Sequence, residues 1–164
     1  ETFKEGGENK RWELRAGDKR DLGIYFFPVA DAHVDEIVIK DPYCGAGDEN
    51  RRILSEFLQE ISKMPREIKK VKIICKELNN KDARHESPAE IKRKILEATR
   101  NIKKAELMTH VYPYRSAKNI HDRSITITVI NEDGTSSKHI FELTGGIDYL
   151  MDSRSETKIF YFRD

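Results

Sequence analysis

The chain alternates short apolar runs with longer amphipathic segments through its first two thirds. Residues 36–40 carry three branched aliphatic side chains in succession and end at Asp41-Pro42, where proline restricts the backbone and removes a donor. Between 49 and 63 the apolar positions recur at helical spacing, and Pro65 closes the pattern. The pattern predicts a buried strand followed by a helix.

The same alternation continues downstream. Residues 71–78 are apolar and β-branched, with turn residues after them. Ser87-Pro88-Ala89-Glu90 supplies an N-cap serine, a proline at the first helical position and a glutamate at the third. Residues 106–114 are again typical of a strand. The order strand, helix, strand, helix, strand predicts a parallel sheet with right-handed crossovers.

The last third has a different pattern. Residues 124–130 alternate isoleucine and threonine, 131–134 have turn chemistry, and 138–143 return as a strand, which predicts an antiparallel hairpin. A final strand is expected at 158–162. In the first 35 residues a strand is indicated at 12–14, while 22–34 combine helical spacing with Pro28. The predicted fold class is α/β: a mixed β-sheet with a parallel βαβαβ half followed by an antiparallel hairpin, with helices on both faces.

Length and charge constrain the kind of protein. The 164 residues fit one domain with a real core, and 30 basic against 29 acidic residues leave a net charge of +1, so an anion-binding surface must be a local patch. No apolar run approaches the roughly 20 residues that span a bilayer, and no secretory signal pattern opens the chain. The chain begins with Glu1 rather than methionine. We expect a cytoplasmic single-domain piece of a longer protein, with partner domains outside it.

The two cysteines do not indicate a metal or a disulfide. Cys44 and Cys75 are too few and too far apart for a zinc pattern, and we expect reduced thiols. Cys75 is predicted in a buried strand, and Cys44, after a turn, is expected to be partly exposed. We find no His/Cys/Asp cluster at ligand spacing and expect neither a metal nor a cofactor.

The tetrapeptide Ile120-His121-Asp122-Arg123 is the strongest chemical signal. At the start of a strand, His121 and Arg123 project to the same side, where both face one phosphate group. A histidine nucleophile also needs a second acid for the leaving group. The structural alternatives are a histidine bonded to a backbone carbonyl and an Arg123 paired with Asp122 or Glu142.

Asp41-Pro42-Tyr43 follows the first predicted strand, and ligands in open α/β sheets bind beyond the carboxyl ends of strands. The functional interpretation makes this segment a wall of the cleft that holds His121 and Arg123. In the structural interpretation Asp41 caps a turn and Tyr43 packs on the next helix.

Three blocks together carry a family resemblance: Asp41-Pro42-Tyr43, Ile120-His121-Asp122-Arg123 and Gly145-Gly146-Ile147-Asp148-Tyr149. They resemble the phospholipase D-like domain found at the C-terminus of microtubule-interacting-and-transport (MIT) domain proteins, the MIT C-terminal domain family. The blocks occur in that family's order and spread over most of the chain. The resemblance implies a phospholipase D-like fold over residues 1–164.

The family's active signature is His-x-Lys-x-x-x-x-Asp, used in two halves. Here arginine stands in the lysine position, Thr128 stands in the aspartate position, and no second His-x-Lys occurs. The resemblance therefore implies a degenerate fold that keeps anion binding, drops catalysis and binds acidic phospholipids at a membrane surface. The expected ligand-binding residues are His121, Arg123, Asp41, Tyr43, Arg115, Lys118, Gly145, Gly146, Asp148 and Tyr149, with His121 the one catalytic candidate.

Basic residues allow other partners. One cluster lies between the first helix and second strand, and another decorates the second helix; a solvated face explains most of them, but converging clusters would attract an anionic surface. Arg115 and Lys118 beside Tyr112 and Tyr114 have the chemistry of nucleic-acid contacts. Two alternatives stay open: a phosphodiesterase or nuclease whose centre joins two copies of His121 in a homodimer, and a nucleic-acid-binding module of a microbial defence or repair system.

Overall fold

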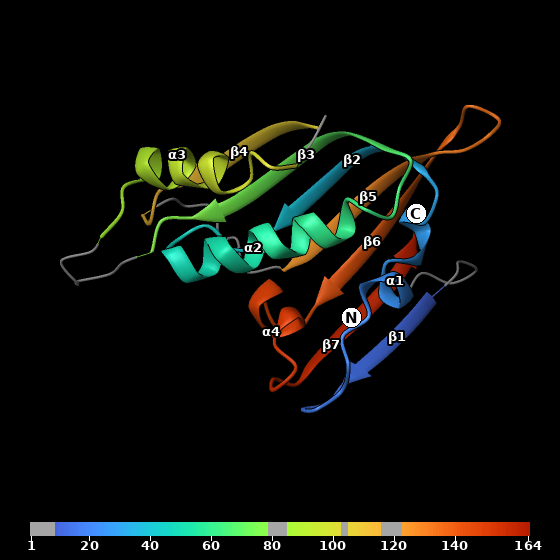
Figure 1. Ribbon diagram of the computed structural model, residues 1–164, viewed down its shortest axis with the longest axis horizontal. Coiled ribbons are helices and arrows are strands. Elements are labelled where there is room, and N and C mark those ends of the chain that lie inside the picture. Colours follow the sequence, from blue (N-terminus) through green and yellow to red (C-terminus); the bar gives the residue numbers. More distant parts are fainter. Residues whose placement is uncertain (1–8, 79–84, 103–104, 116–122) are drawn as a thin grey trace.

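The computed structural model describes residues 9–78, 85–102, 105–115 and 123–164. Their strands form one seven-stranded mixed sheet in the order β1-β7-β6-β5-β2-β3-β4 (Figure 1). The strands are β1 (Asn9–Leu14), β2 (His33–Lys40), β3 (Glu67–Lys76), β4 (Glu106–Tyr112), β5 (Ser124–Ile130), β6 (Ser136–Leu143) and β7 (Thr157–Arg163). The helices are α1 (Leu22–Tyr25), the 3-10 helix η1 (Phe27–Val29), α2 (Asp48–Ile61), α3 (Pro88–Ala98) and α4 (Ile147–Met151).

Strands β2, β3 and β4 pair in parallel and are connected through α2 and α3, which confirms the predicted βαβαβ half. The capping serine acts as its sequence context predicts, because the Ser87 side chain accepts a hydrogen bond from the Glu90 backbone N–H at 3.2 Å. The partners Ile37 and Val71 are both buried, as expected where β-branched residues fill the covered face of a sheet.

Strands β5 and β6 form the predicted hairpin, and the antiparallel half is wider than the sequence indicated. Gly134 has a φ of +85° in the connecting turn, where the Asn131 N–H donates to the Thr135 carbonyl at 2.7 Å. Strand β7 extends the hairpin and β1 adds an outer strand beside β7. The two halves are joined where β5 pairs antiparallel with β2.

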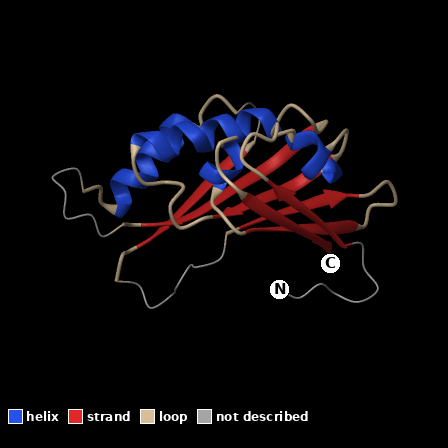
Figure 2. Ribbon diagram, turned by 90° about the horizontal axis from the view of Figure 1, so that it is seen from below, coloured by secondary structure: helices blue, strands red, loops and turns tan. Residues whose placement is uncertain are grey.

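The helices lie together on one face of the sheet, so the prediction of helices on both faces is wrong (Figure 2). Helix α2 contacts α1, α3 and α4, which places all four in one layer. The reason lies in the strand order. From β2 to β3 to β4 the chain advances in one direction, and successive crossovers of the same hand then place both helices on the same face. Helices reach both faces of a doubly wound sheet only where the strand order reverses.

The hydrophobic core fills the space between the helix layer and the sheet. Phe26, Phe57 and Phe141 are fully buried there, and the ring centroids of Phe26 and Phe141 are 4.7 Å apart. On the opposite face, every described strand residue is at least partly exposed except Phe160, which is 4% exposed. We call this the open face of the sheet.

Both cysteines belong to the core. Cys75 is buried as predicted, but Cys44 is only 5% exposed, so its expected partial exposure is wrong. A Cβ placed on Gly45 would lie 2.5 Å from the Cys75 sulfur, so only glycine permits the chain after Cys44 to approach β3 this closely. The hydrogen bond between the two thiols, together with burial, raises the pKa of Cys44 and keeps it protonated.

Among the described residues, no helix has the length and apolar character required to cross a bilayer.

Candidate functional site

Three of the predicted segments meet at one edge of the sheet. Asp41 and Tyr43 follow β2, Arg123 immediately precedes β5, and Gly145 and Gly146 follow β6. Because β5 runs antiparallel to both β2 and β6, its start lies beside the ends of those strands. The sheet order thus brings together segments about 100 residues apart. The predicted residues His121 and Lys118 lie outside the described residues.

Asp41 connects the first block to the third. Its side chain is 3% exposed; Oδ1 accepts from the Tyr43 backbone N–H at 2.9 Å, and Oδ2 accepts from the Ile147 backbone N–H at 3.0 Å. The carboxylate thereby caps both a turn and the first residue of α4. Of the two interpretations, the turn cap is the one seen for Asp41, and its contacts show no direct ligand role.

The two glycines allow the backbone to approach its neighbours closely. A Cβ on Gly146 would lie 2.9 Å from Asp41 Oδ2 and 2.5 Å from Asp148 Oδ1. A Cβ on Gly145 would lie 2.7 Å from the Cβ of Tyr149. Any larger residue at these positions would push the loop away from Asp41, so the glycines shape the site.

Arg123 provides the cation of the site. Its guanidinium carbon lies 5.4 Å from the ring centroid of Tyr43, within cation–π range, and Nη1 donates to the Thr144 carbonyl at 3.3 Å. Its Nε is buried with no hydrogen-bond partner among the described residues. Arg123 thus has donor capacity beyond its contact with Thr144, as a site for an anion requires. Tyr43 is 49% exposed, and it lines a small cleft together with Asn50 and Ile53 of the next helix, α2.

The structural alternative, in which Arg123 pairs with Glu142, is not seen in the fold. Glu142 lies opposite Ser124, on the open face, whereas the side chain of Arg123 reaches Tyr43 on the other side of the sheet edge. No carboxylate among the described residues forms an ion pair with Arg123; Asp122 lies outside them.

A narrow cleft lies between the first and third blocks. Its volume is ≈ 10 Å³, enough for about one water molecule. Its lining residues are Asp41, Tyr43, Cys44, Asn50, Ile53, Ile147 and Asp148. A ligand larger than water would therefore bind on the surface above the cleft, beside the half-exposed rings of Tyr43 and Tyr149, which are each 49% exposed.

Arg115 follows β4 at the same edge, but β3 separates β4 from β2. The neighbouring Tyr114 backbone N–H donates to Glu77 at 3.0 Å, and Lys76 Nζ lies 5.6 Å from the Tyr114 ring centroid. Arg115 is thus the start of a second, adjacent patch of basic and aromatic residues.

The two basic clusters seen in the sequence do not converge. Lys72 and Lys76 belong to the open face of β3, while α3 lies in the helix layer on the other side. On α3, Lys94 pairs with Glu86 at 2.9 Å and Arg93 pairs with Glu97 at 3.4 Å. The cations of α3 are largely neutralised, so a solvated helix face explains them.

Sequence reasoning missed one buried ion pair beside the site. Arg51 is 3% exposed; Nη1 and Nη2 each donate to a Glu86 carboxylate oxygen at 2.8 Å, and Nη1 also donates to the Gly45 carbonyl at 2.9 Å. Arg51 falls on the apolar stripe of α2, which was a detectable anomaly. Its partner, 35 residues away, could not be read from the sequence. The pair fixes the loop that carries Tyr43 and Cys44.

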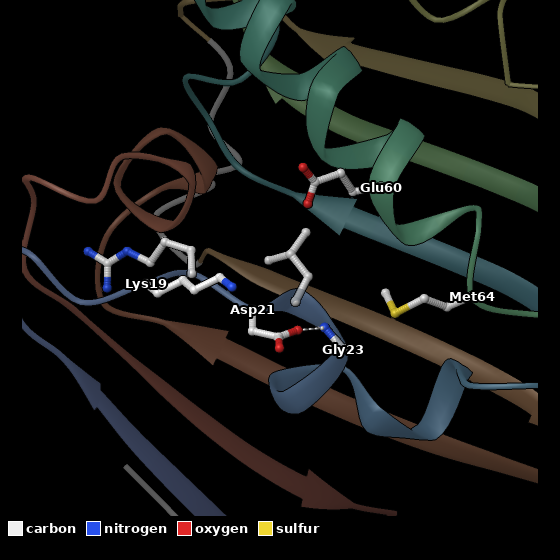
Figure 3. A pocket seen from close by; sticks show the side chains of 7 residues that line it. Lys19, Asp21, Gly23, Glu60 and Met64 are labelled. Atoms are coloured by element: carbon white, nitrogen blue, oxygen red, sulfur yellow. Dashed lines mark hydrogen bonds between the residues drawn. The ribbon is translucent and has the colours of Figure 1, made fainter.

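A larger hollow lies elsewhere, between the segment before α1 and the end of α2 (Figure 3). Its volume is ≈ 270 Å³, and its lining residues are Lys19, Arg20, Asp21, Leu22, Gly23, Glu60 and Met64. It contains two basic and two acidic side chains, and Asp21 is used to accept from the Gly23 N–H at 3.1 Å. None of the predicted site residues lines this hollow, and its mixed charge favours no class of ligand.

Within the described residues, no three His, Cys, Asp or Glu side chains group together as a metal site would need.

Comparisons with known proteins find matches among solved structures only. No protein-family model and no curated protein matches the chain. Among solved structures, a mutant of yeast tyrosyl-DNA phosphodiesterase aligns over 94% of this chain and 32% of its own, with 11% identity and a TM-score of 0.46. The chain thus spans about a third of that protein's length. These comparisons therefore assign no family to the chain.

Proposed function

We propose that this chain is a non-catalytic phospholipase D-like module that binds phosphate-bearing ligands, in particular acidic phospholipid headgroups, and thereby localises a larger protein. The observation that carries the proposal is Arg123, stacked on Tyr43 with a buried Nε that has no described partner. A guanidinium with spare donors and an aromatic support binds phosphate well. The resemblance of the three sequence blocks to the MIT C-terminal domain family supports the same ligand class.

The position of Thr128 supports loss of catalysis. In the active signature this residue is an aspartate, but here it lies on the open face, opposite Glu36 on one side and Lys138 on the other. Thr128 has no carboxylate, so it cannot supply the negative charge that the aspartate provides in the active signature. We expect no hydrolysis of bis(p-nitrophenyl) phosphate by the purified chain.

Liposome co-sedimentation tests the proposal. Vesicles of phosphatidylcholine alone are compared with vesicles that also contain phosphatidylserine or a phosphoinositide. We expect binding only to the acidic vesicles, weakening as salt rises because the attraction is electrostatic. Equal binding, or equal failure, with both compositions would contradict the proposal.

The matched variants are Arg123→Ala and Arg66→Ala. Arg66 pairs with Asp31 at 2.8 Å and lies in the α2–β3 connection, immediately before β3, at the opposite edge of the sheet. Both variants remove one positive charge, so a general charge effect would weaken vesicle binding equally in both. We expect Arg123→Ala to reduce binding at least about fivefold and Arg66→Ala to reduce it less than about twofold, since one basic residue near an anionic membrane contributes about 1 kcal/mol.

A second candidate is nucleic-acid binding, favoured by the patch on the open face. Lys72 and Lys76 project there, and Lys76 lies over Tyr114, which is 42% exposed. Cations interleaved with exposed aromatics are typical of surfaces that bind single strands. Salt-dependent binding of a fluorescent oligonucleotide, lost in Lys72→Ala/Lys76→Ala but kept in Arg123→Ala, would favour this function over the first.

A further inference from the structure

The open face has an ordered arrangement of residues, read from the strand pairing. A central row crosses the sheet from β7 to β4 through Phe162, Ile140, Thr126, Val38, Lys72 and Met108. All are partly buried except Met108, which is 44% exposed. The row is mostly apolar, although no described helix covers it. Parallel strands such as β2 and β3 normally have both faces covered, so this face has the character of a surface that pairs with a partner.

The two rows beside the central one alternate in charge. On the side nearer the candidate site, Glu142 of β6 and Lys40 of β2 flank Ser124 of β5. On the other side, Lys138 of β6 and Glu36 of β2 flank Thr128 of β5. In both rows the charges on the two sides of β5 are opposite. When opposite charges lie at equal distances on the two sides of a line, a second copy rotated by 180° about that line places each charge over an opposite one.

A two-fold axis that runs along β5 exploits this arrangement. Such an axis places β6 of one copy over β2 of the other. Glu142 then meets Lys40 of the second copy, and Lys138 meets Glu36. In the central row Ile140 meets Val38, while Thr126 meets its own copy on the axis. The three central strands thus offer two opposite-charge contacts and one apolar contact, each formed twice.

The next strands outward are compatible with the same axis. Phe162 of β7 meets Lys72 of β3, a cation–π combination. One like-charge pair arises at a corner, where Lys158 faces Lys76, but Glu13 is the strand partner of Lys158 and offsets it. The alternative two-fold axis, running across the strands along the central row, also brings opposite charges together, with Glu142 over Lys138 and Lys40 over Glu36. It differs in stacking Lys72 of β3 on its own copy, a like-charge contact that the axis along β5 avoids.

We propose that the open face is the interface of a symmetric dimer of this chain, with the two sheets packed face to face about a two-fold axis along β5. Packing of two twisted sheets in aligned fashion is an established geometry, with sheets about 10 Å apart. Five strands and five residues of each cover roughly 400 Å² of sheet per copy. A standard interface buries about 800 Å² per partner, so we expect a dimer that dissociates on dilution into the low micromolar range.

The symmetry has a consequence for ligand binding, which rests on the proposed function. An axis parallel to the strands leaves strand direction unchanged, so the Arg123 sites of both copies lie at the same end of the dimer. Two sites facing one way can engage one membrane together and gain avidity over a single site. An axis across the strands would place them at opposite ends.

Sedimentation equilibrium over a range of concentrations tests the interface with charge variants. Glu142→Lys creates two like-charge contacts with Lys40 per dimer and should raise the dissociation constant at least about tenfold. The double variant Lys40→Glu/Glu142→Lys restores opposite charges and should return the constant to within about threefold of the original. Glu132→Lys, in the exposed β5–β6 turn, makes the same charge change away from the interface and should have little effect.

Each other outcome overturns the proposal. Rescue of Glu142→Lys by Lys138→Glu instead of Lys40→Glu would indicate the axis across the strands. A dimer indifferent to Glu142→Lys would use another surface, such as the outer strands β1 or β4. A chain that stays monomeric at high micromolar concentration has no such dimer. Circular dichroism and urea unfolding of each variant establish that it is folded; Glu142 is exposed, so its replacement should not disturb the monomer. A monomer that still binds acidic vesicles would reject the dimer while keeping the proposed function.

Discussion

The two faces of the same sheet differ in composition although they come from the same strands. Along β5, Ile125, Ile127 and Val129 point toward the helices and are buried, while Thr126 and Thr128 point to the open face. The first set is held by a core with fixed partners inside the chain. The second set has partial burial and no described helix above it. The comparison shows which residues specify the fold and which remain available for a partner.

The largest contrast is expected between two phenylalanines. Phe57→Ala empties a fully buried site that packs against Phe26, with ring centroids 5.6 Å apart, and should cost about 3–5 kcal/mol. Phe162→Ala on the open face should cost about 1 kcal/mol or less when the protein is dilute. Urea unfolding of both variants measures the difference. Equal losses would mean that the open face contributes to monomer stability as the core does.

The next largest effect concerns the buried charge in the helix layer. Glu86→Gln leaves Arg51 with reduced compensation and should cost about 3 kcal/mol. Glu97→Gln, which removes a surface partner of Arg93, should change stability by less than about 0.5 kcal/mol. Urea midpoints of the two variants, which carry the same chemical change, give the comparison. Similar midpoints would show that Asp48, which already accepts from Arg51 Nη2 at 2.7 Å, compensates the charge by itself.

The Glu86 carboxylate should make the stability of the folded chain depend on pH. Hydrogen bonds from Arg51 lower the pKa of Glu86 from 4.5 to about 2 in the folded chain. Because the folded pKa is below the unfolded one, the stabilisation is present above about pH 4.5 and is lost as the pH falls toward 2. The unfolding midpoint of the natural chain should therefore fall more steeply than that of Glu86→Gln in this window. Parallel curves would contradict the role assigned to Glu86.

An intermediate effect is expected at the sheet edge that joins the two halves. Asp41→Asn keeps one oxygen acceptor but cannot accept from both Tyr43 and Ile147, so it should cost about 1–3 kcal/mol. Asp31→Asn, at an exposed position, should leave the urea midpoint nearly unchanged. Hydrogen exchange should be accelerated locally at Ile147 in Asp41→Asn. Unchanged exchange there would show that Asp41 does not hold α4.

The smallest effect should come from the centre of the open face. Val38→Thr should change monomer stability by less than about 0.5 kcal/mol, because threonine can hydrate there. Val71→Thr, one strand away on the covered face, buries a hydroxyl and should cost about 1–3 kcal/mol. At high concentration Val38→Thr should still weaken the proposed dimer. A large monomer effect of Val38→Thr would mean that the open face is covered within one chain.

Local patterns predicted most of the elements but not their assembly. The helix that begins after Ser87, the β5–β6 hairpin and the parallel β2, β3 and β4 follow from capping chemistry, turn residues and periodicity. Cys44 was predicted to be partly exposed and the helices were predicted to lie on both faces of the sheet. Both predictions were wrong, because burial and coverage depend on how elements far apart in the chain pack. The candidate site was predicted as a set of residues. The sequence could not show that both carboxylate oxygens of Asp41 accept from backbone N–H groups, or that Arg123 Nε has no partner among the described residues.

The amino-acid sequence by itself determined where strands and helices form, because those choices depend on residues within a few positions of one another. The tertiary structure decided that β5 joins β2, that Asp41 reaches Ile147 across 106 residues, and that the described helices cover only one face of the sheet (Figure 2). These are pairings between distant segments, and many arrangements satisfy the same local preferences. Packing of the shared core selects one of them, and with it the edge where Arg123 and Tyr43 meet.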